Sequence, residues 1–187
     1  MGAGESRSIS KSVDVNEIAE TCELPVKTVH RLWKRFCELD KDNKGKLDAD
    51  DFDEIHAFHL NPLSERIIAL FLDSTGHCDF ESFCKLIAVF QPCDKNTPPD
   101  AINSPRKKAT LLYQLFDLGE TYEIDHTHVF DILLLMVGKD VDVKQLKQIS
   151  KRVILETTEG DKHKVSLEEF LNSLDEAVVG LKMSVGY

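Results

Sequence analysis

The sequence predicts an all-α protein made of four helix–loop–helix units that pair into two lobes. Three observations support this fold class. Apolar residues recur at intervals of three and four along most of the chain, which is the spacing of one helix face. Loops of related pattern separate the helices at four places. A proline-rich stretch, residues 91–106, divides the helical pattern into two halves.

The helices can be placed one by one from their apolar positions and their end signals. Pro62 opens one helix. Asp142 is the expected N-cap of another, and Ser166 with Glu169 forms a capping box. The apolar positions are Val29, Leu32, Trp33, Phe36 and Cys37; Ile67, Ile68, Leu70 and Phe71; Phe80, Phe83, Cys84, Leu86, Ile87 and Phe90; Leu111, Leu112, Leu115 and Phe116; Leu146, Ile149, Val153 and Ile154; and Phe170, Leu171 and Leu174.

The composition excludes several classes of protein. The 187 residues are 42% hydrophobic, enough for a packed core, and the net charge of −10 argues against a nucleic-acid partner. No apolar run approaches the roughly 20 residues that span a bilayer, and the first ten residues lack the apolar segment of a secretory signal. Five cysteines without a CxxC pair indicate reduced thiols in a cytoplasmic protein.

The loop from Asp40 to Asp51 carries the most specific pattern in the chain. It reads DKDNKGKLDADD, with acidic residues at positions 1, 3 and 9, Gly45 at position 6 and Leu47 at position 8. Amphipathic helices flank it on both sides. This is the form of an EF-hand loop, a twelve-residue calcium-binding turn between two helices.

Three weaker copies of this loop follow in the same register. They are Phe71–Ser82, Asp117–His128 and Thr158–Glu169. We expect the four loops to pair two by two through their position-8 residues. Two short antiparallel β-ladders should result, one joining Leu47 to Cys78 and the other joining Ile124 to Val165.

The loops differ in what they can bind, because calcium needs six to eight oxygen ligands. The candidate metal ligands of the first loop are Asp40, Asp42, Asp48 and Asp51. Lys44 stands at position 5, where an oxygen is needed, and Asp51 is one methylene shorter than the usual Glu at position 12. This loop should hold at most one weak Ca²⁺ or Mg²⁺. The other three have lost most ligands and should hold the fold together without metal.

The first six residues, MGAGES, fit the N-myristoylation motif, which makes Gly2 the expected lipidation site. A single acyl chain gives only marginal membrane binding. The nearby basic residues are Arg7 and Lys11 alone, and no cysteine beside Gly2 offers a second acyl chain. Stable residence on a membrane therefore requires a second contact, most simply a membrane-protein partner.

The segment Ile132–Val137 is the candidate partner-helix groove. Its residues are apolar all round their helix: Ile132, Leu133, Leu134, Leu135, Met136 and Val137. One face can enter the core, and the rest needs another cover, with Leu134 or Leu135 expected to face a partner. Met and Leu suit an adaptable groove for an amphipathic helix. The alternative is a helix buried in its own lobe. The C-terminal Leu181, Met183, Val185 and Tyr187 are candidates to cover the empty groove.

Several longer motifs resemble the calcineurin B branch of the EF-hand proteins. They are NPLSERII at Asn61–Ile68, LLLMVG at Leu133–Gly138, VKQLKQISKRVI at Val143–Ile154 and KMS at Lys182–Ser184. Two subfamilies compete, the phosphatase regulatory subunit and the calcineurin B homologous proteins. The long linker, with FQP at Phe90–Pro92 and INS at Ile102–Ser104, is similar to that of the homologous proteins. The chain is therefore identified as a diverged member of that group with degenerate calcium loops.

This resemblance implies two EF-hand lobes on one face of a long hydrophobic groove that holds a helix of a plasma-membrane Na⁺/H⁺ exchanger. It also implies calcium in the third and fourth loops, where this sequence has lost the ligands. We expect a non-enzymatic adaptor, cytoplasmic and peripheral to the plasma membrane, that binds its helix largely without calcium. The expected organisation is a myristoylation segment at 1–14, a first lobe at 15–90, a linker at 91–107, and a second lobe with the C-terminal tail at 108–187.

Three alternatives stay open from the sequence. The first is a B-type regulatory subunit of a calcineurin-like phosphatase, and the second is a weak calcium sensor. The third is a zinc enzyme that uses the pairs His56/His59 and His77/Cys78. No nucleophile–base motif or phosphate loop supports catalysis, and the unrelated spacing of the two pairs is more typical of dispersed side chains.

Overall fold

The computed structural model describes residues 13–117, 119, 121–138, 141–158 and 162–185. Its helices are α1 (Val15–Thr21), α2 (Val26–Leu39), α3 (Ala49–Asp53), α4 (His56–His59), α5 (Ser64–Ala69), α6 (Phe80–Val89), α7 (Pro105–Phe116), α8 (His126–Val137), α9 (Val143–Thr157), α10 (Leu167–Ser173) and α11 (Glu176–Lys182). Strands β1 (Ile124–Asp125) and β2 (Lys164–Val165) pair antiparallel. The predicted all-α class is confirmed. No helix in the described part of the chain is both long and apolar enough to span a membrane.

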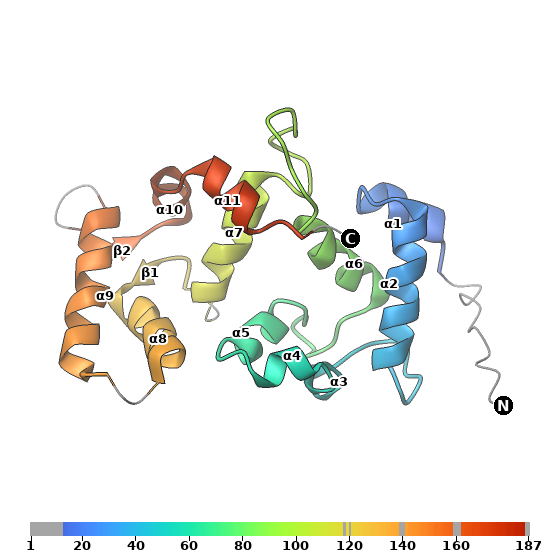
Figure 1. The fold of residues 1–187 in the computed structure, drawn as a ribbon, viewed down its shortest axis with the longest axis horizontal. Helices are drawn as coiled ribbons and strands as arrows, with labels where there is room; N and C mark the ends of the chain where they lie inside the picture. The colour runs from blue at the N-terminus through green and yellow to red at the C-terminus, as the bar shows by residue number, and fades with distance from the viewer. Residues whose placement is uncertain (1–12, 118, 120, 139–140, 159–161, 186–187) are drawn as a thin grey trace.

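The helices gather in two groups along the long axis of the molecule. Figure 1 shows α1–α6 on one side and α8–α10 on the other, with α7 and α11 between them and α5 reaching below α7. The first group surrounds an aromatic core that includes Phe36, Phe52 and Phe83. The second group has a smaller core around Tyr113, Ile154 and neighbouring aliphatic residues. Each group therefore has a hydrophobic core of its own.

The predicted pairing of loops is confirmed in both groups. Leu47 and Cys78 form an antiparallel bridge, and each backbone N–H donates to the other's carbonyl at 2.8 Å. Ile124 lies opposite Val165 in the β1–β2 pair. All four side chains are almost fully buried. The position-8 residues thus join each pair of loops and also contribute to the core beneath them.

The helix ends follow the capping signals of the sequence. The Asp142 carboxylate accepts a hydrogen bond from the Lys144 N–H at the start of α9. Ser166 and Glu169 form the predicted capping box of α10. The short helices that were not predicted include α1 and α11. Each is seven residues long and has an aspartate N-cap, Asp14 or Asp175, but is too short to show a clear apolar period.

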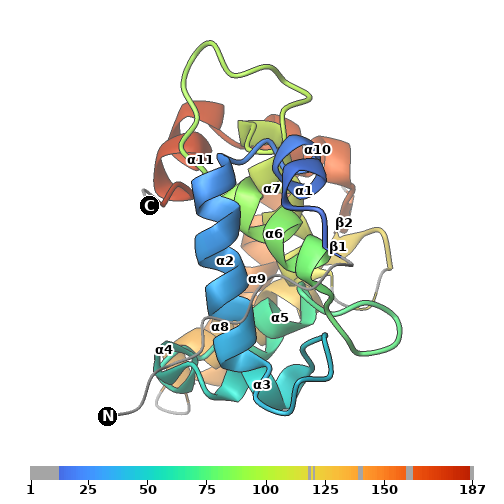
Figure 2. The same cartoon turned by 90° about the vertical axis from the view of Figure 1, so that its right-hand side faces the viewer.

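The end of the proline-rich stretch differs from the prediction. Residues 105–107, expected in the linker, form the first turn of α7, with Ser104 as N-cap and Pro105 at the first helical position. Proline is favoured there because its fixed φ suits a helix and its missing N–H would have no partner anyway. Figures 1 and 2 both show the preceding residues as a loop that projects beyond the helices.

A buried lysine ties this loop to the C-terminal segment. The Lys108 side chain is fully buried, and its ammonium donates to the carbonyls of Val89 at 2.5 Å, Gln91 at 2.7 Å and Met183 at 3.2 Å. Burial lowers the pKa of Lys108. The Val185 N–H donates to the Phe90 carbonyl beside it. One side chain therefore joins the end of α6, the start of the linker and the end of α11.

Candidate functional site: an apolar groove and four EF-hand loops

An open apolar cavity of about 280 Å³ lies between α8 and α9. Its wall is apolar apart from Thr157, and it continues from the core of the second group. The cavity-facing residues of α8 recur at helical spacing: Val129, Ile132, Leu133 and Met136. Ile149 and Val153 of α9 face them, and both side chains remain substantially exposed. The second group thus leaves part of its apolar interior open to the surface.

The structure divides the predicted groove segment between two faces of α8. Ile132 is buried, Leu133 is half-buried and Met136 is 59% exposed, and all three line the cavity. Leu134, Leu135 and Val137 are also exposed but do not line it. Leu134 and Leu135, which the sequence favoured as partner-facing, therefore do not line this cavity, and their contact with a partner stays a prediction. The segment is apolar on every side of α8, so the sequence does not show which side faces the cavity.

The contribution of α9 to this groove was not predicted from the sequence. Ile149 and Val153 are spaced four residues apart, which is also the spacing of a core face. The structure instead places Ile154 in the core, while Ile149 and Val153 are 48% and 40% exposed. The useful signal was an apolar stripe wider than one lobe needs, since Val143 and Leu155 on the same helix are exposed as well.

The C-terminal segment does not cover this cavity. Met183 and Val185 are held at the junction of α6 and α7 by the hydrogen bonds of their backbones, and none of the described residues of the tail lines the groove. Leu181 is 79% exposed. The expected cover of the empty groove is thus not seen among residues 181–185, and Tyr187 lies outside the described residues.

In the first loop, the position-1 carboxylate shapes the turn. Asp40 is 5% exposed, and its two oxygens accept hydrogen bonds from the N–H groups of Lys44 at 2.9 Å and Gly45 at 3.0 Å. Gly45 has φ +76, the left-handed conformation that glycine adopts without a steric penalty. The chain therefore turns tightly about the Asp40 side chain.

The other acidic residues of this loop surround a lysine. The Lys44 ammonium lies 2.5 Å from Asp48 Oδ2, 2.8 Å from Asp51 Oδ2 and 3.6 Å from Asp42 Oδ2. Asp48 and Asp51 also form the capping box of α3. The hydrogen bonds to Asp48 and Asp51 raise the pKa of Lys44, and the bond from Lys44 lowers that of Asp48. The ammonium is thus held in its charged form between the carboxylates.

The third loop repeats the turn of the first with different residues. Asp117 accepts hydrogen bonds from the N–H groups of Thr121 at 2.8 Å and Tyr122 at 2.7 Å, at the same two loop positions. Tyr122 takes φ +61 at the position of Gly45, with its side chain 77% exposed. The loss of glycine therefore strains this turn without preventing it. His128, at position 12, lies 2.9 Å from Asp125 through Nδ1 and 3.9 Å from Asp117 through Nε2.

The fourth loop repeats the lysine contact of the first. Lys162 at position 5 places its ammonium 2.6 Å from Oε1 of Glu169 at position 12. Glu169 also accepts hydrogen bonds from the Ser166 N–H and hydroxyl. The contacts of Lys162 and Ser166 lower the pKa of Glu169 from its ordinary 4.5 to about 2. The last acidic ligand of this loop is therefore already engaged within the chain.

The second loop turns about Asp73, which accepts hydrogen bonds from the N–H groups of Thr75 and His77.

Within the described residues, no group of three or more His, Cys, Asp or Glu side chains is arranged to hold a metal ion. The four aspartates of the first loop converge on Lys44 and its turn instead, so the weak metal site there stays a prediction. His56 and His59 lie together on α4, with ring centroids 6.3 Å apart.

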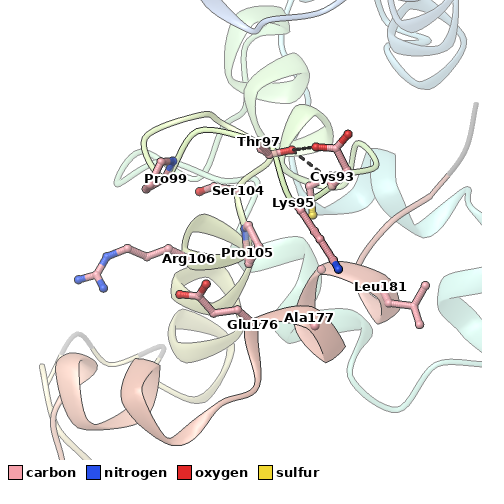
Figure 3. A pocket seen from close by; sticks show the side chains of 12 residues that line it. Cys93, Lys95, Thr97, Pro99, Ser104, Pro105, Arg106, Glu176, Ala177 and Leu181 are labelled. Atoms are coloured by element: carbon pink, nitrogen blue, oxygen red, sulfur yellow. Dashed lines mark hydrogen bonds between the residues drawn. The ribbon is translucent and has the colours of Figure 1, made fainter.

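A second cavity, of about 680 Å³, lies between the proline-rich loop, the start of α7 and α11 (Figure 3). Its wall carries charges of both signs, including Lys95, Arg106 and Glu176. Lys95 points toward α11, while Arg106 reaches Glu168 at 2.7 Å. A Cβ atom added at Gly180 would lie 3.0 Å from Cys93 Sγ, so a glycine here lets the loop approach α11 closely.

The expected lipidation site, Gly2, lies outside the described residues.

Comparison with known proteins identifies the family. No family model matches the chain. It is 30% identical over 173 residues to the type 2 calcineurin B subunit of Dictyostelium discoideum, an alignment that covers 91% of this chain and 89% of that protein. It is 29% identical over 183 residues to the calcineurin B subunit of Naegleria gruberi, covering 97% and 98% of the two chains. The identity to the calcineurin B subunit of Candida glabrata is also 29%, over 188 residues, with 100% and 99% covered.

The paired loops and their flanking helices define an EF-hand protein. The similarity to the Dictyostelium protein over nearly the whole of both chains then gives the family. The chain belongs to the calcineurin B family.

Proposed function

We propose that this protein is a non-enzymatic regulatory subunit that binds an amphipathic helix of a calcineurin-type phosphatase catalytic subunit. The observation that carries the proposal is the open apolar cavity between α8 and α9. An amphipathic helix can place its apolar side chains in such a cavity and keep its polar face in water. Three similar proteins of nearly the same length are named as calcineurin B subunits, which supports the phosphatase as the source of the helix.

A phosphatase catalytic subunit is thus proposed as the partner, in place of the Na⁺/H⁺ exchanger that the resemblance of the sequence motifs implied. None of the three relatives described above carries a name that refers to an exchanger. An exchanger helix would use the same groove, so the two partners differ in affinity and not in the type of contact. Myristoylation of Gly2 and peripheral attachment to the plasma membrane remain proposals that rest on the N-terminal motif.

Binding of the helix should depend little on calcium. The position-1 aspartates of the first and third loops are engaged by the backbone of their own turns. Acidic residues at later positions of the first and fourth loops contact lysines of the same loop. The pairing of loops that supports the groove is therefore formed by the chain itself. The weak calcium sensor is the less favoured alternative.

Two matched substitutions on α9 test the groove. Ile149 and Leu155 are 48% and 47% exposed, but only Ile149 lines the cavity. Glutamate at position 149 would place an unpaired charge under the docked helix, which is costly. The probe is a peptide from the helix of the calcineurin catalytic chain that binds its regulatory partner. We expect Ile149→Glu to weaken binding of this peptide by at least about tenfold, or about 1.4 kcal/mol. Leu155→Glu should change the affinity by less than about threefold.

The same titrations decide between partners. The wild-type protein is measured against the phosphatase peptide and against a membrane-proximal helix of an Na⁺/H⁺ exchanger, with calcium and with chelator. Tighter binding of the exchanger helix would contradict the choice of the phosphatase. Equal effects of Ile149→Glu and Leu155→Glu would contradict the assignment of the groove. Thermal melts of both variants show whether a lost affinity reflects a lost fold.

A further inference from the structure

Basic side chains of the chain itself lie where an EF-hand holds its cation. In the first loop, Lys44 contacts two carboxylates directly and a third at 3.6 Å. In the fourth loop, Lys162 contacts the position-12 carboxylate. Both lysines stand at position 5 of their loops, which is a calcium-ligand position. The arrangement occurs once in each pair of loops.

We propose that the Lys44 ammonium is a tethered counter-ion that takes the place of calcium in the first loop and excludes divalent cations from it. Lys162 has the same role toward Glu169 in the fourth loop. The inference concerns how the loops are held closed, so it does not depend on which helix occupies the groove. It goes beyond the loss of ligands, because it gives the lysine a positive function.

The contacts of Lys44 reproduce much of what a bound cation does. The ammonium approaches Asp48 and Asp51 at 2.5 Å and 2.8 Å, close to the roughly 2.3–2.6 Å of calcium–oxygen bonds. It draws position 9 and position 12 toward position 5, which links the two ends of the loop. The Lys44 and Asp51 side chains are only 23% and 13% exposed, so solvent screens this contact less than it screens an ordinary surface pair.

The charges also favour the lysine. Without a cation, Asp42, Asp48 and Asp51 would repel one another at the start of α3, and the ammonium removes part of that repulsion. A lysine in the same loop is present at high effective concentration, so no free metal is needed to close the turn. A divalent cation would have to displace the ammonium and would meet only the oxygens that remain. The first loop is therefore closed at any calcium concentration.

Lys46 provides a matched control in the same loop. It carries the same charge at position 7 but is exposed, and its side chain makes no ion pair in the described residues. Lys44→Asn supplies an oxygen at position 5 and removes the ammonium, whereas Lys46→Asn changes the net charge of the loop equally. Any difference between the two variants therefore reports the position of the ammonium and not the charge of the protein.

The experiment is a calcium titration of the full chain followed by NMR at the Gly45 amide, the position-6 group of this loop. We expect Lys44→Asn to gain a site with a dissociation constant of roughly 10⁻⁵–10⁻⁴ M, at least about tenfold tighter than any site in Lys46→Asn or the wild type. Without calcium, Lys44→Asn should melt at a lower temperature, and millimolar calcium should restore it. Lys44→Arg should gain no site.

Equal calcium binding by Lys44→Asn and Lys46→Asn would overturn the proposal. So would calcium binding at Gly45 in the wild type with the affinity of the Lys44→Asn variant. If Lys44→Asn fails to fold even with calcium, the wild type gives the deciding measurement. Its Lys44 ammonium signal should stay unchanged in millimolar calcium, and displacement of that signal would overturn the proposal equally.

Discussion

The two groups of helices differ in how completely they bury their apolar side chains. In the first group, the rings of Phe36, Phe80 and Phe83 pack together, with the Phe36 centroid 5.4 Å and 5.7 Å from the other two, and all three are nearly fully buried. In the second group, Met136, Ile149 and Val153 stay exposed around an open cavity. Both groups pair their loops in the same way. The helix–loop–helix frame therefore does not decide whether a lobe is closed; the side chains that fill it do.

The largest expected effect is a core substitution in the closed group. Phe52 is 1% exposed and its ring contacts those of Phe58 and Phe71. Phe52→Ala removes most of the buried side chain and leaves a cavity, so we expect a loss of about 3–5 kcal/mol in the free energy of unfolding. Met136→Ala, on the open groove, should cost less than about 1 kcal/mol. Urea unfolding of both variants measures the difference, and similar losses would show that the groove is as closed as the core.

The next effect concerns the junction between the groups. Lys108→Met removes the donor that three backbone carbonyls share, while it also removes the cost of a buried charge. We expect a net loss of about 2 kcal/mol in the free energy of unfolding and faster hydrogen exchange at Val185. The exposed neighbour gives the control, since Lys107→Met should change neither quantity appreciably. Unchanged exchange at Val185 in Lys108→Met would contradict a role for this lysine in holding the tail.

The sequence predicted the frame more completely than the groove. Position 8 is apolar in every loop, so the sequence alone could pair Leu47 with Cys78 and Ile124 with Val165. The orientation of α8 could not be predicted, because a helix that is apolar on all sides has no polar face to mark which side meets water. The position of the Lys44 ammonium was also missed. Its spacing showed a lost oxygen ligand, but only the folded turn brings it between Asp48 and Asp51.

A smaller effect sharpens the orientation of α8. Met136 lines the cavity, whereas Leu134 lies on another face of the same helix, and both are at least one-third exposed. Met136→Gln should weaken binding of the phosphatase helix by about fivefold to tenfold, because the amide is buried under the ligand without a partner. Leu134→Gln should change it by less than about twofold. Calorimetric titration of both variants measures this, and a stronger effect at Leu134 would move the groove to the other face of α8.

The smallest expected effect is a change in the acid sensitivity of stability caused by Glu169 in the fourth loop. Contacts with Lys162 and Ser166 depress the pKa of Glu169 from 4.5 to about 2, so its ionised form is favoured by the folded state. The stability that it contributes is complete above pH 4.5 and is lost as the pH falls toward 2. Glu169→Gln should therefore flatten the fall in the urea midpoint across this window. Lys162→Gln should flatten it nearly as much, since the lysine is the largest cause of the shift. If both variants keep the slope of the wild type, the Lys162 contact does not hold the fourth loop closed in solution.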